Sequence, residues 1–169
     1  MEAFIIHNIP IYAITAWSGA GKTTFIENLI PELSKLGLRS AVIKHDAHDF
    51  EIDKEGKDTF RFTQAGAEVV AIASKTHAAI MENRFLSLEK ILERINDVDV
   101  ILIEGFKGVK LNGLRRIGLR RESYELPEGK YIAVISDTPF KCDVPVFGVN
   151  DYYGFAEWLF NDIKLLNLP

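Results

Sequence analysis

Residues 19–24 have the composition and the setting of a loop that binds phosphate. They read Gly-Ala-Gly-Lys-Thr-Thr, directly after the apolar run 11–15 and directly before a helical pattern. Glycine lets backbone N–H groups turn inward and approach phosphate oxygens, and the following helix adds the positive end of its dipole. The pattern predicts that residues 16–24 wrap the phosphates of a purine nucleoside triphosphate. The predicted contact residues are Trp17, Ser18, Gly19, Ala20, Gly21, Lys22, Thr23 and Thr24.

Two side chains of this loop have predicted chemical roles. Lys22 would reach the β- and γ-phosphates, and the hydroxyl of Thr23 would hold Mg²⁺. The general pattern Gly-x-x-x-x-Gly-Lys-Ser/Thr begins with glycine, whereas this chain has Ala16. Alanine serves at that position if its backbone φ is negative. The alternative, a glycine-rich turn without a ligand, is disfavoured because a strand and a helix flank the motif.

A second candidate for the metal site is Glu104, which ends the apolar run 98–104 and is followed by Gly105. A hydrophobic strand that ends in a carboxylate is how proteins with such a loop place an acid beside Mg²⁺, usually through water. The glycine allows a close approach at that point. An ordinary turn is the alternative for a glutamate followed by glycine, but the phosphate-binding loop favours a catalytic and metal-binding role.

The polar stretch 44–59 follows the apolar run 40–44 and therefore emerges at the same sheet edge as the phosphate-binding loop. It holds two histidines and several carboxylates, which permit a zinc site as one interpretation. The interpretation we prefer is a switch-like loop that faces the γ-phosphate, Mg²⁺ and substrate. Within it, Asp53 is the predicted carboxylate near Mg²⁺ or the attacking water.

Recognition of the base has weaker signals. The guanine-reading pattern Asn-Lys-x-Asp is absent from the sequence. Asp137 ends the run 131–136 and is a candidate to accept hydrogen bonds from the N1–H and the exocyclic amine of guanine. Asn150 follows the last apolar run. For both residues, capping of a helix or a turn is the open alternative.

Short apolar runs rich in β-branched residues recur along the chain, at 9–15, 40–44, 69–73, 98–104, 131–136 and 144–149. Their nearly continuous hydrophobicity is typical of parallel strands buried on both faces. Amphipathic helical patterns occupy 23–36, 87–95 and 152–165. The alternation predicts one α/β domain over residues 1–169, a three-layer α/β/α sandwich with a mostly parallel sheet and ligands at the carboxyl ends of its strands.

Residues 107–121 contain six basic side chains and no acid. A solvated face is the common explanation of such a run, but its position after a strand that ends in Glu104 also favours contact with phosphates or with an acidic partner. The pattern of residues 114–121 predicts irregular structure or an antiparallel edge strand.

Composition excludes several other classes of protein. The net charge of −4 argues against a nucleic-acid platform, and the N-terminal stretch fits neither a signal peptide nor a membrane span. The single cysteine, Cys142, excludes an intrachain disulfide framework. A reducing cytoplasm is the expected compartment.

Four blocks of sequence together resemble the molybdopterin-guanine dinucleotide biosynthesis protein B family. They are WSGAGKTT (17–24), KHDAHDF (44–50), DKEGKDTFRFTQAGA (53–67) and LIEGFK (102–107). The likeness extends from about residue 9 to about residue 163. The phosphate-binding block is shared by many families, whereas the second and third blocks are specific.

This resemblance implies a homodimeric GTP- and Mg²⁺-binding protein with weak GTPase activity and a doubly wound P-loop fold. It also implies an accessory role in attaching GMP to molybdopterin, where the partner protein A, a molybdopterin guanylyltransferase, performs the nucleotidyl transfer. The resemblance assigns the contacts with phosphate and Mg²⁺ to Lys22, Thr23 and Thr24. It makes Glu104 the strand-terminal acid beside the metal. Within the signature loop, whose role stays unassigned, lie His45, His48, Asp53, Lys57, Asp58 and Arg61.

Two other functions remain open from the residues. One is a small-molecule kinase that uses the basic segment 107–121 as a lid or to bind a phosphorylated acceptor. The other is an adaptor that binds nucleotide without hydrolysing it.

Overall fold

The computed structural model describes residues 5–6, 9–45, 52–105, 114–122 and 125–166. The chain divides into two units, one formed by residues 1–45 and 93–169 and the other by residues 46–92. The single domain expected from the sequence stays a prediction.

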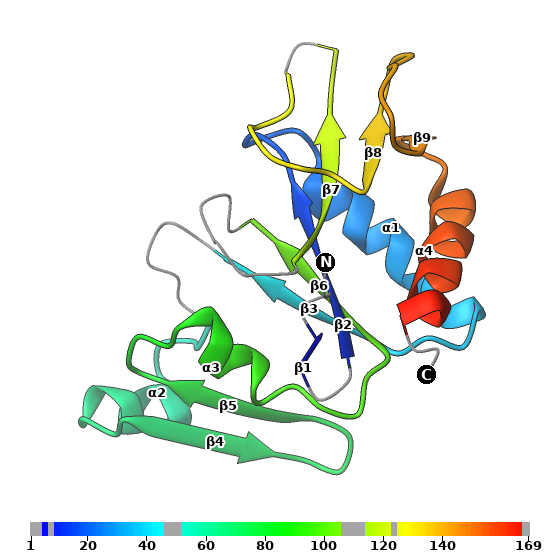
Figure 1. Ribbon diagram of the computed structural model, residues 1–169. Coiled ribbons are helices and arrows are strands. Elements are labelled where there is room, and N and C mark those ends of the chain that lie inside the picture. Colours follow the sequence, from blue (N-terminus) through cyan, green and yellow to red (C-terminus); the bar gives the residue numbers. More distant parts are fainter. Residues whose placement is uncertain (1–4, 7–8, 46–51, 106–113, 123–124, 167–169) are drawn as a thin grey trace. The chain divides into compact units, whose positions relative to one another are not determined.

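The first unit is built on one twisted sheet whose strand order is β3-β6-β2-β7-β8-β9 (Figure 1). All neighbours in this order run parallel, and a short strand, β1, adds an antiparallel pair to β2. The strands are β1 (Ile5–Ile6), β2 (Ile9–Thr15), β3 (Ser40–Lys44), β6 (Val100–Glu104), β7 (Arg115–Arg120), β8 (Ala133–Ser136) and β9 (Val146–Gly148).

Strand β2 lies in the middle of this sheet because every residue from Ile9 to Thr15 is apolar or small enough to be buried. It pairs with β6 on one side and β7 on the other, with Ile14 opposite both Glu104 and Ile117. Parallel strands end at the same edge, so the loop after β2 lies between the ends of β6 and β7. The predicted α/β class with a mostly parallel sheet is confirmed.

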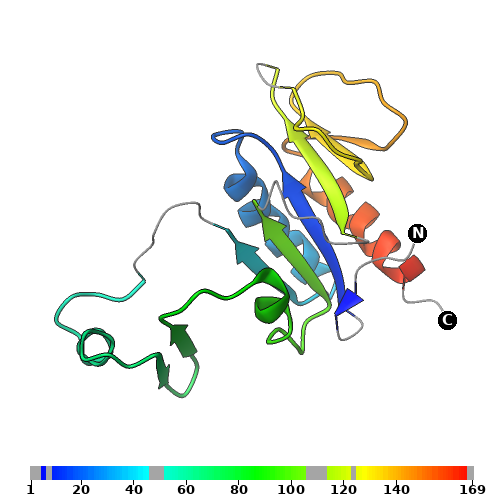
Figure 2. The same cartoon turned by 60° about the vertical axis from the view of Figure 1, so that its left-hand side comes forward.

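Two helices, α1 (Lys22–Lys35) and α4 (Tyr152–Leu166), pack side by side on one face of the sheet (Figure 2). Their apolar faces meet the alternate strand residues that include Tyr12 and Ile14, and Phe25 of α1 contacts Phe155 of α4 edge to face. After the end of α1 at Lys35, Gly37 (φ +81°) turns the chain, and the N–H of Leu38 bonds the carbonyl of Leu33. The core of this unit therefore lies between α1, α4 and the sheet.

The prediction for residues 114–121 is wrong. They form β7, a parallel strand inside the sheet between β2 and β8. The physical reason is its centre, where Ile117, Gly118 and Leu119 are buried, while the arginines occupy both ends. A Cβ on Gly118 would lie 2.7 Å from a methyl group of Leu126, so any larger residue would force the Leu126 side chain to shift.

The second unit contains two short helices, α2 (Asp58–Gln64) and α3 (Leu88–Leu92), and a hairpin of β4 (Val69–Ala73) and β5 (Ala78–Glu82). The hairpin strands are antiparallel, with Val69 opposite Glu82. The prediction that residues 69–73 join the buried parallel sheet is therefore wrong. Only Val70 of β4 is buried, so its continuous apolar run does not reflect burial on both faces.

Candidate functional site

The loop between β2 and α1 has the backbone of a phosphate cradle. Gly19 and Gly21 adopt left-handed φ values of +76° and +93°. In the described part of the chain, Asp97 is the only non-glycine residue with positive φ, so Ala16 has the negative φ at which alanine is allowed. Ala20 is buried, whereas the loop residues from Trp17 to Gly19 are exposed. Alanine in place of the expected glycine therefore causes no strain.

Helix α1 begins at Lys22, directly after Gly21, and no side chain caps its N-terminus. The first N–H groups of a helix have no partner inside it and attract anions. The Nζ of Lys22 donates to the carbonyl of Trp17 (3.2 Å) and lies 3.5 Å from that of Ala16. The ammonium group thus lies back over the loop, where it adds positive charge to the helix N-terminus.

Thr23 and Glu104 meet at this helix N-terminus although 81 positions separate them. The Oγ1 of Thr23 donates a 2.7 Å hydrogen bond to Oε1 of Glu104, which is only 9% exposed. In an octahedral magnesium site with bonds of about 2.0–2.1 Å, neighbouring oxygen ligands are about 2.9 Å apart. A hard hydroxyl–carboxylate pair at this spacing fits Mg²⁺, either directly or through a shared water.

The end of β3 lies close to the end of β6. The N–H of His45 donates to the carbonyl of Glu104 (3.0 Å), and a Cβ on Gly105 would lie 3.1 Å from the carbonyl oxygen of His45. Gly105 also has a φ of +98°, so both space and backbone require glycine. His45, the first histidine of the polar stretch, is therefore at the same sheet edge as the phosphate cradle, whereas His48 lies outside the described residues.

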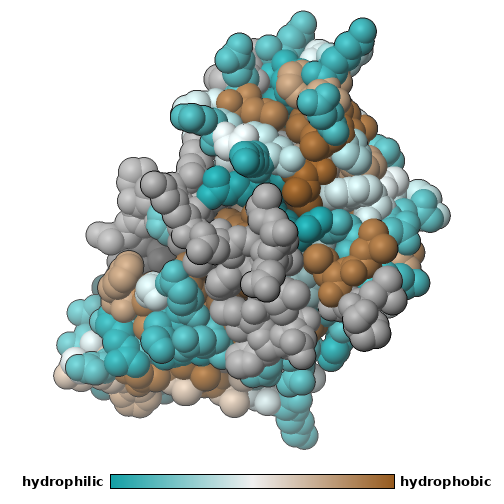
Figure 3. Space-filling model, in the orientation of Figure 1, coloured by the Kyte–Doolittle hydropathy of each residue, from teal (hydrophilic) through white to brown (hydrophobic). Residues whose placement is uncertain are grey.

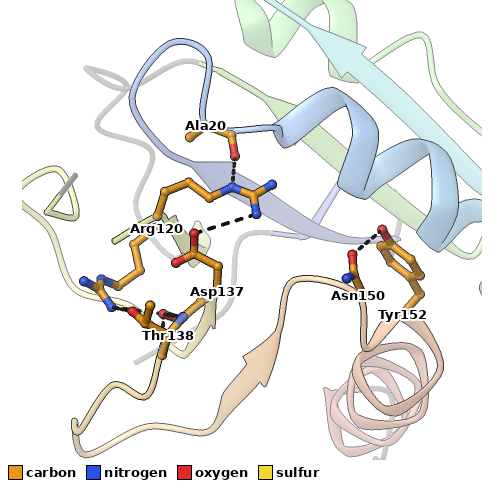
Figure 4. Close-up of polar contacts among 8 residues, drawn as sticks. Ala20, Arg120, Asp137, Thr138, Asn150 and Tyr152 are labelled. Atoms are coloured by element: carbon orange, nitrogen blue, oxygen red, sulfur yellow. Dashed lines mark hydrogen bonds and ion pairs between the residues drawn. The ribbon is translucent and has the colours of Figure 1, made fainter. Parts of the chain in front are cut away.

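Asp137, the predicted guanine reader, follows β8 at the carboxyl edge of the sheet (Figure 4). Its Oδ2 lies 4.0 Å from Nη1 of Arg121, whose Nε donates to the carbonyl of Ala20 (2.9 Å). Sequence reasoning did not find Arg121 as a site residue. The only signal was its place at the end of the basic run, which is uninformative until β7 is known to neighbour β2.

Asn150 and its neighbour Asp151 occupy the turn before α4. The hydroxyl of Tyr152 donates to Oδ1 of Asn150 (3.3 Å). Asp151 caps the helix, because its Oδ1 accepts from the N–H of Gly154 (3.0 Å). The cap of α4 is therefore Asp151, the residue after Asn150.

Asp53 belongs to the second unit, where it organises the turn before α2. Its Oδ1 accepts hydrogen bonds from Oγ1 of Thr59 (3.0 Å) and from the N–H of Lys54 (2.9 Å). Its Oδ2 is buried and has no hydrogen-bond partner among the described residues. A role of Asp53 at the metal or at the attacking water stays a prediction.

The basic run is not a solvated face where the structure describes it. A guanidinium N–H of Arg115 donates to Asp162 of α4, and Arg120 donates to the hydroxyls of Ser136 (3.0 Å) and Thr138 (3.1 Å). These arginines hold the sheet, α4 and the end of β8 together. Because Arg115–Arg120 is a central strand, this segment cannot serve as the lid of the kinase alternative; Lys107 and Lys110 lie outside the described residues.

The structure also bears on two alternatives, a zinc site and a membrane-spanning helix. Within the described residues, no cluster of three or more histidine, cysteine, aspartate or glutamate side chains is placed to hold a metal ion. Residues 46–51, which hold one of the two histidines and several of the carboxylates behind the zinc interpretation, fall outside that part of the chain. The described helices also include none with the length and apolar character to cross a membrane.

Comparison with known proteins places the chain in a family. Residues 11–137 match the family model of molybdopterin guanine dinucleotide synthesis protein B. A molybdopterin-guanine dinucleotide biosynthesis adapter protein of Escherichia coli (strain K12) is 38% identical over 160 residues, which cover 89% of this chain and 91% of the relative. A protein of the same name from Haemophilus influenzae is 36% identical over 166 residues, 94% of this chain and 92% of the relative.

A solved structure gives the same result for the fold. The crystal structure of Bacillus subtilis MobB superposes with a TM-score of 0.73 at 27% identity, covering 90% of this chain and 97% of that one. Sequence family and fold therefore agree. The chain belongs to the molybdopterin guanine dinucleotide synthesis protein B family.

Proposed function

We propose that this protein is a GTP- and Mg²⁺-binding adapter that assists the attachment of GMP to molybdopterin. Membership of the family supports the biosynthetic role, since its relatives carry the name adapter protein. The observation that carries the nucleotide part is the hydrogen bond between Thr23 and Glu104 at the N-terminus of α1. It brings the predicted metal-binding hydroxyl and acid together beside the phosphate cradle.

In this proposal the triphosphate lies against the backbone N–H groups from Gly19 to Thr24. The charge of Lys22 and the dipole of α1 offset the charge of the β- and γ-phosphates. Thr23 and Glu104 would hold Mg²⁺, which would neutralise phosphate charge. Asp137 reads guanine, because β8 ends at the sheet edge where nucleotides bind in parallel α/β folds.

We further propose that GTP hydrolysis is weak and that the protein acts as an accessory factor. Glu104 is hydrogen-bonded to Thr23 and thus committed to the metal side of the site. Asp53 remains the candidate to orient the attacking water. The proposed partners are molybdopterin and protein A, the molybdopterin guanylyltransferase, in the cytoplasm.

We propose a homodimer, with a second copy of the chain on the β4–β5 hairpin. Apolar side chains of this hairpin are exposed, notably Val69 (48%), Ile72 (54%) and Ile80 (71%). Figure 3 shows brown surface along the lower edge of the view, where Figure 1 has β4. A two-stranded hairpin is marginally stable alone, so pairing with a second copy would stabilise it. Light scattering measures the resulting mass directly.

The test of the nucleotide proposal compares Lys22→Ala with Lys35→Ala, at the other end of the same helix. Lys35 is exposed, pairs with Glu32 and lies far from the cradle, so its variant serves as the matched control. We expect Lys22→Ala to abolish GTP binding in calorimetric titration with Mg²⁺, and Lys35→Ala to leave it unchanged. Equal affinity of both variants would refute the phosphate assignment.

The biosynthetic proposal needs a reconstituted reaction. Molybdopterin, GTP, Mg²⁺ and protein A are incubated with and without this chain, and dinucleotide formation is measured. We expect more dinucleotide with wild-type protein than with Lys22→Ala. No effect of the wild-type chain would remove the adapter role in this reaction.

A further inference from the structure

Arg121 contacts the phosphate cradle from outside and belongs to none of the four sequence blocks that carry the family resemblance. It follows β7, the strand beside β2, and its Nε donates a 2.9 Å hydrogen bond to the carbonyl oxygen of Ala20. The carbonyls of a cradle point away from the phosphates when its N–H groups point inward. The guanidinium therefore binds the back of the loop and leaves its inner surface open.

The same guanidinium touches two further parts of the site. Its Nη2 would lie 2.7 Å from a Cβ on Gly21, so the guanidinium reaches the backbone of the residue directly before α1. Its Nη1 lies 4.0 Å from Oδ2 of Asp137. That separation is too long for a hydrogen bond, so the cation attracts the carboxylate without occupying its acceptor lone pairs.

A second contact links the same stretch of chain to the loop. The indole Nε1 of Trp17 donates to the carbonyl of Glu125 (2.8 Å), four residues after Arg121. The segment that leaves β7 therefore holds the loop at Trp17 and at Ala20. The predicted phosphate cradle is supported by a part of the chain about 100 positions away.

We propose that Arg121 is a positioning residue that couples the phosphate end of the nucleotide site to its base end. It fixes the loop through Ala20 and orients the carboxylate of Asp137 toward the purine. This inference rests on the proposed function, because it assumes that the loop binds phosphate and that Asp137 faces the base. It requires the planar fork of arginine, since one lysine ammonium cannot donate to Ala20 and approach Asp137 from separate nitrogens.

The test is calorimetric binding of GTP, GDP and ATP with Mg²⁺ to wild-type protein, Arg121→Gln and Arg121→Lys. Arg39→Gln is the matched control, because Arg39 is an exposed arginine whose ion pair with Asp99 joins the amino ends of β3 and β6. A hydrogen bond from a charged donor changes an equilibrium constant by roughly tenfold or more. We expect Arg121→Gln to weaken GTP and GDP about tenfold each and to lower the preference for GTP over ATP.

Each alternative gives a different result. Loss confined to GTP and ATP, with GDP binding spared, would overturn the inference in favour of a γ-phosphate contact, and full recovery in Arg121→Lys would reduce the role to charge alone. An equal loss for GTP, GDP and ATP would make Arg121 a support of the loop without influence on Asp137. Unchanged binding in Arg121→Gln refutes the inference while leaving the proposed function intact. Absence of nucleotide binding in the wild type overturns both, and melting curves without nucleotide check that each variant is folded.

Discussion

Replacing Arg115 with methionine tests whether the basic run serves the fold, as the structure indicates, or a partner, as the sequence suggested. Asp162 of α4 accepts hydrogen bonds from Arg115 and from the hydroxyl of Tyr12 (2.6 Å). The side chains of Arg115 and Asp162 are only 22% and 16% exposed, and Tyr12 is fully buried. Burial, and then the bond to Asp162, raise the pKa of Tyr12, so its phenol remains the donor at neutral pH.

Methionine keeps the apolar stem of Arg115 but removes the charge, which leaves the Asp162 carboxylate largely buried without its counter-ion. Breaking a buried pair from one side costs about 3–5 kcal/mol, and the residual exposure of this pair favours the lower end. A loss of about 3 kcal/mol corresponds to a fall in melting temperature of about 6–12 °C for a chain of this size.

Thermal denaturation followed by circular dichroism at pH 7 measures this loss. The control is Arg39→Met, since Arg39 and Asp99 have side chains that are 64% and 33% exposed and solvent screens their ion pair. We expect the control to melt close to wild type. If Arg115→Met also melted at the wild-type temperature while its binding to protein A was lost, Arg115 would be a partner contact and the structural reasoning would be wrong.

Two further predictions concern the carboxyl and the amino ends of the sheet strands. Gly105→Ala should lower the free energy of unfolding in urea by about 1–3 kcal/mol, because φ is +98° and the new methyl group meets the carbonyl of His45. Gly37→Ala, with positive φ but open space around it, should lose less, and an equal loss would show that the contact with His45 is unimportant. For Asp99, hydrogen bonds from Arg39 lower the pKa of the carboxyl. The ionised Asp99 carboxylate therefore stabilises the fold fully above the ordinary carboxyl pKa, and this stabilisation disappears as pH falls through the lowered pKa of the folded protein. The melting temperatures of wild type and Asp99→Asn should converge in acid. A difference in melting temperature that stays constant with pH would contradict this.

Strand bounds are predicted best for β2 and β3, of which β2 is buried along its whole length whereas β3 buries only Ile43. The bounds of β2 and β3 were predicted as observed, because continuous apolar runs are interrupted by polar residues at both ends. Strand β7 was not recognised, since arginines at both ends conceal a centre of only three buried residues. Strand β4 was assigned to the wrong sheet, because an apolar run does not distinguish burial from an exposed hairpin face.

Some contacts of the candidate site can likewise be predicted from local rules, whereas others depend on long-range packing. The contact between Thr23 and Glu104 follows from a rule that holds whatever the strand order, namely that acids at the ends of parallel strands gather beside the phosphate loop. The contact between Arg121 and Ala20 follows only if the strand that ends near Arg121 is the neighbour of β2. That neighbourhood depends on which apolar strand completes the centre of the sheet, and the sequence around residues 114–121 predicts an edge. A residue whose role requires a particular neighbour in space is therefore found only once the sheet order is known, and Arg121 is such a residue.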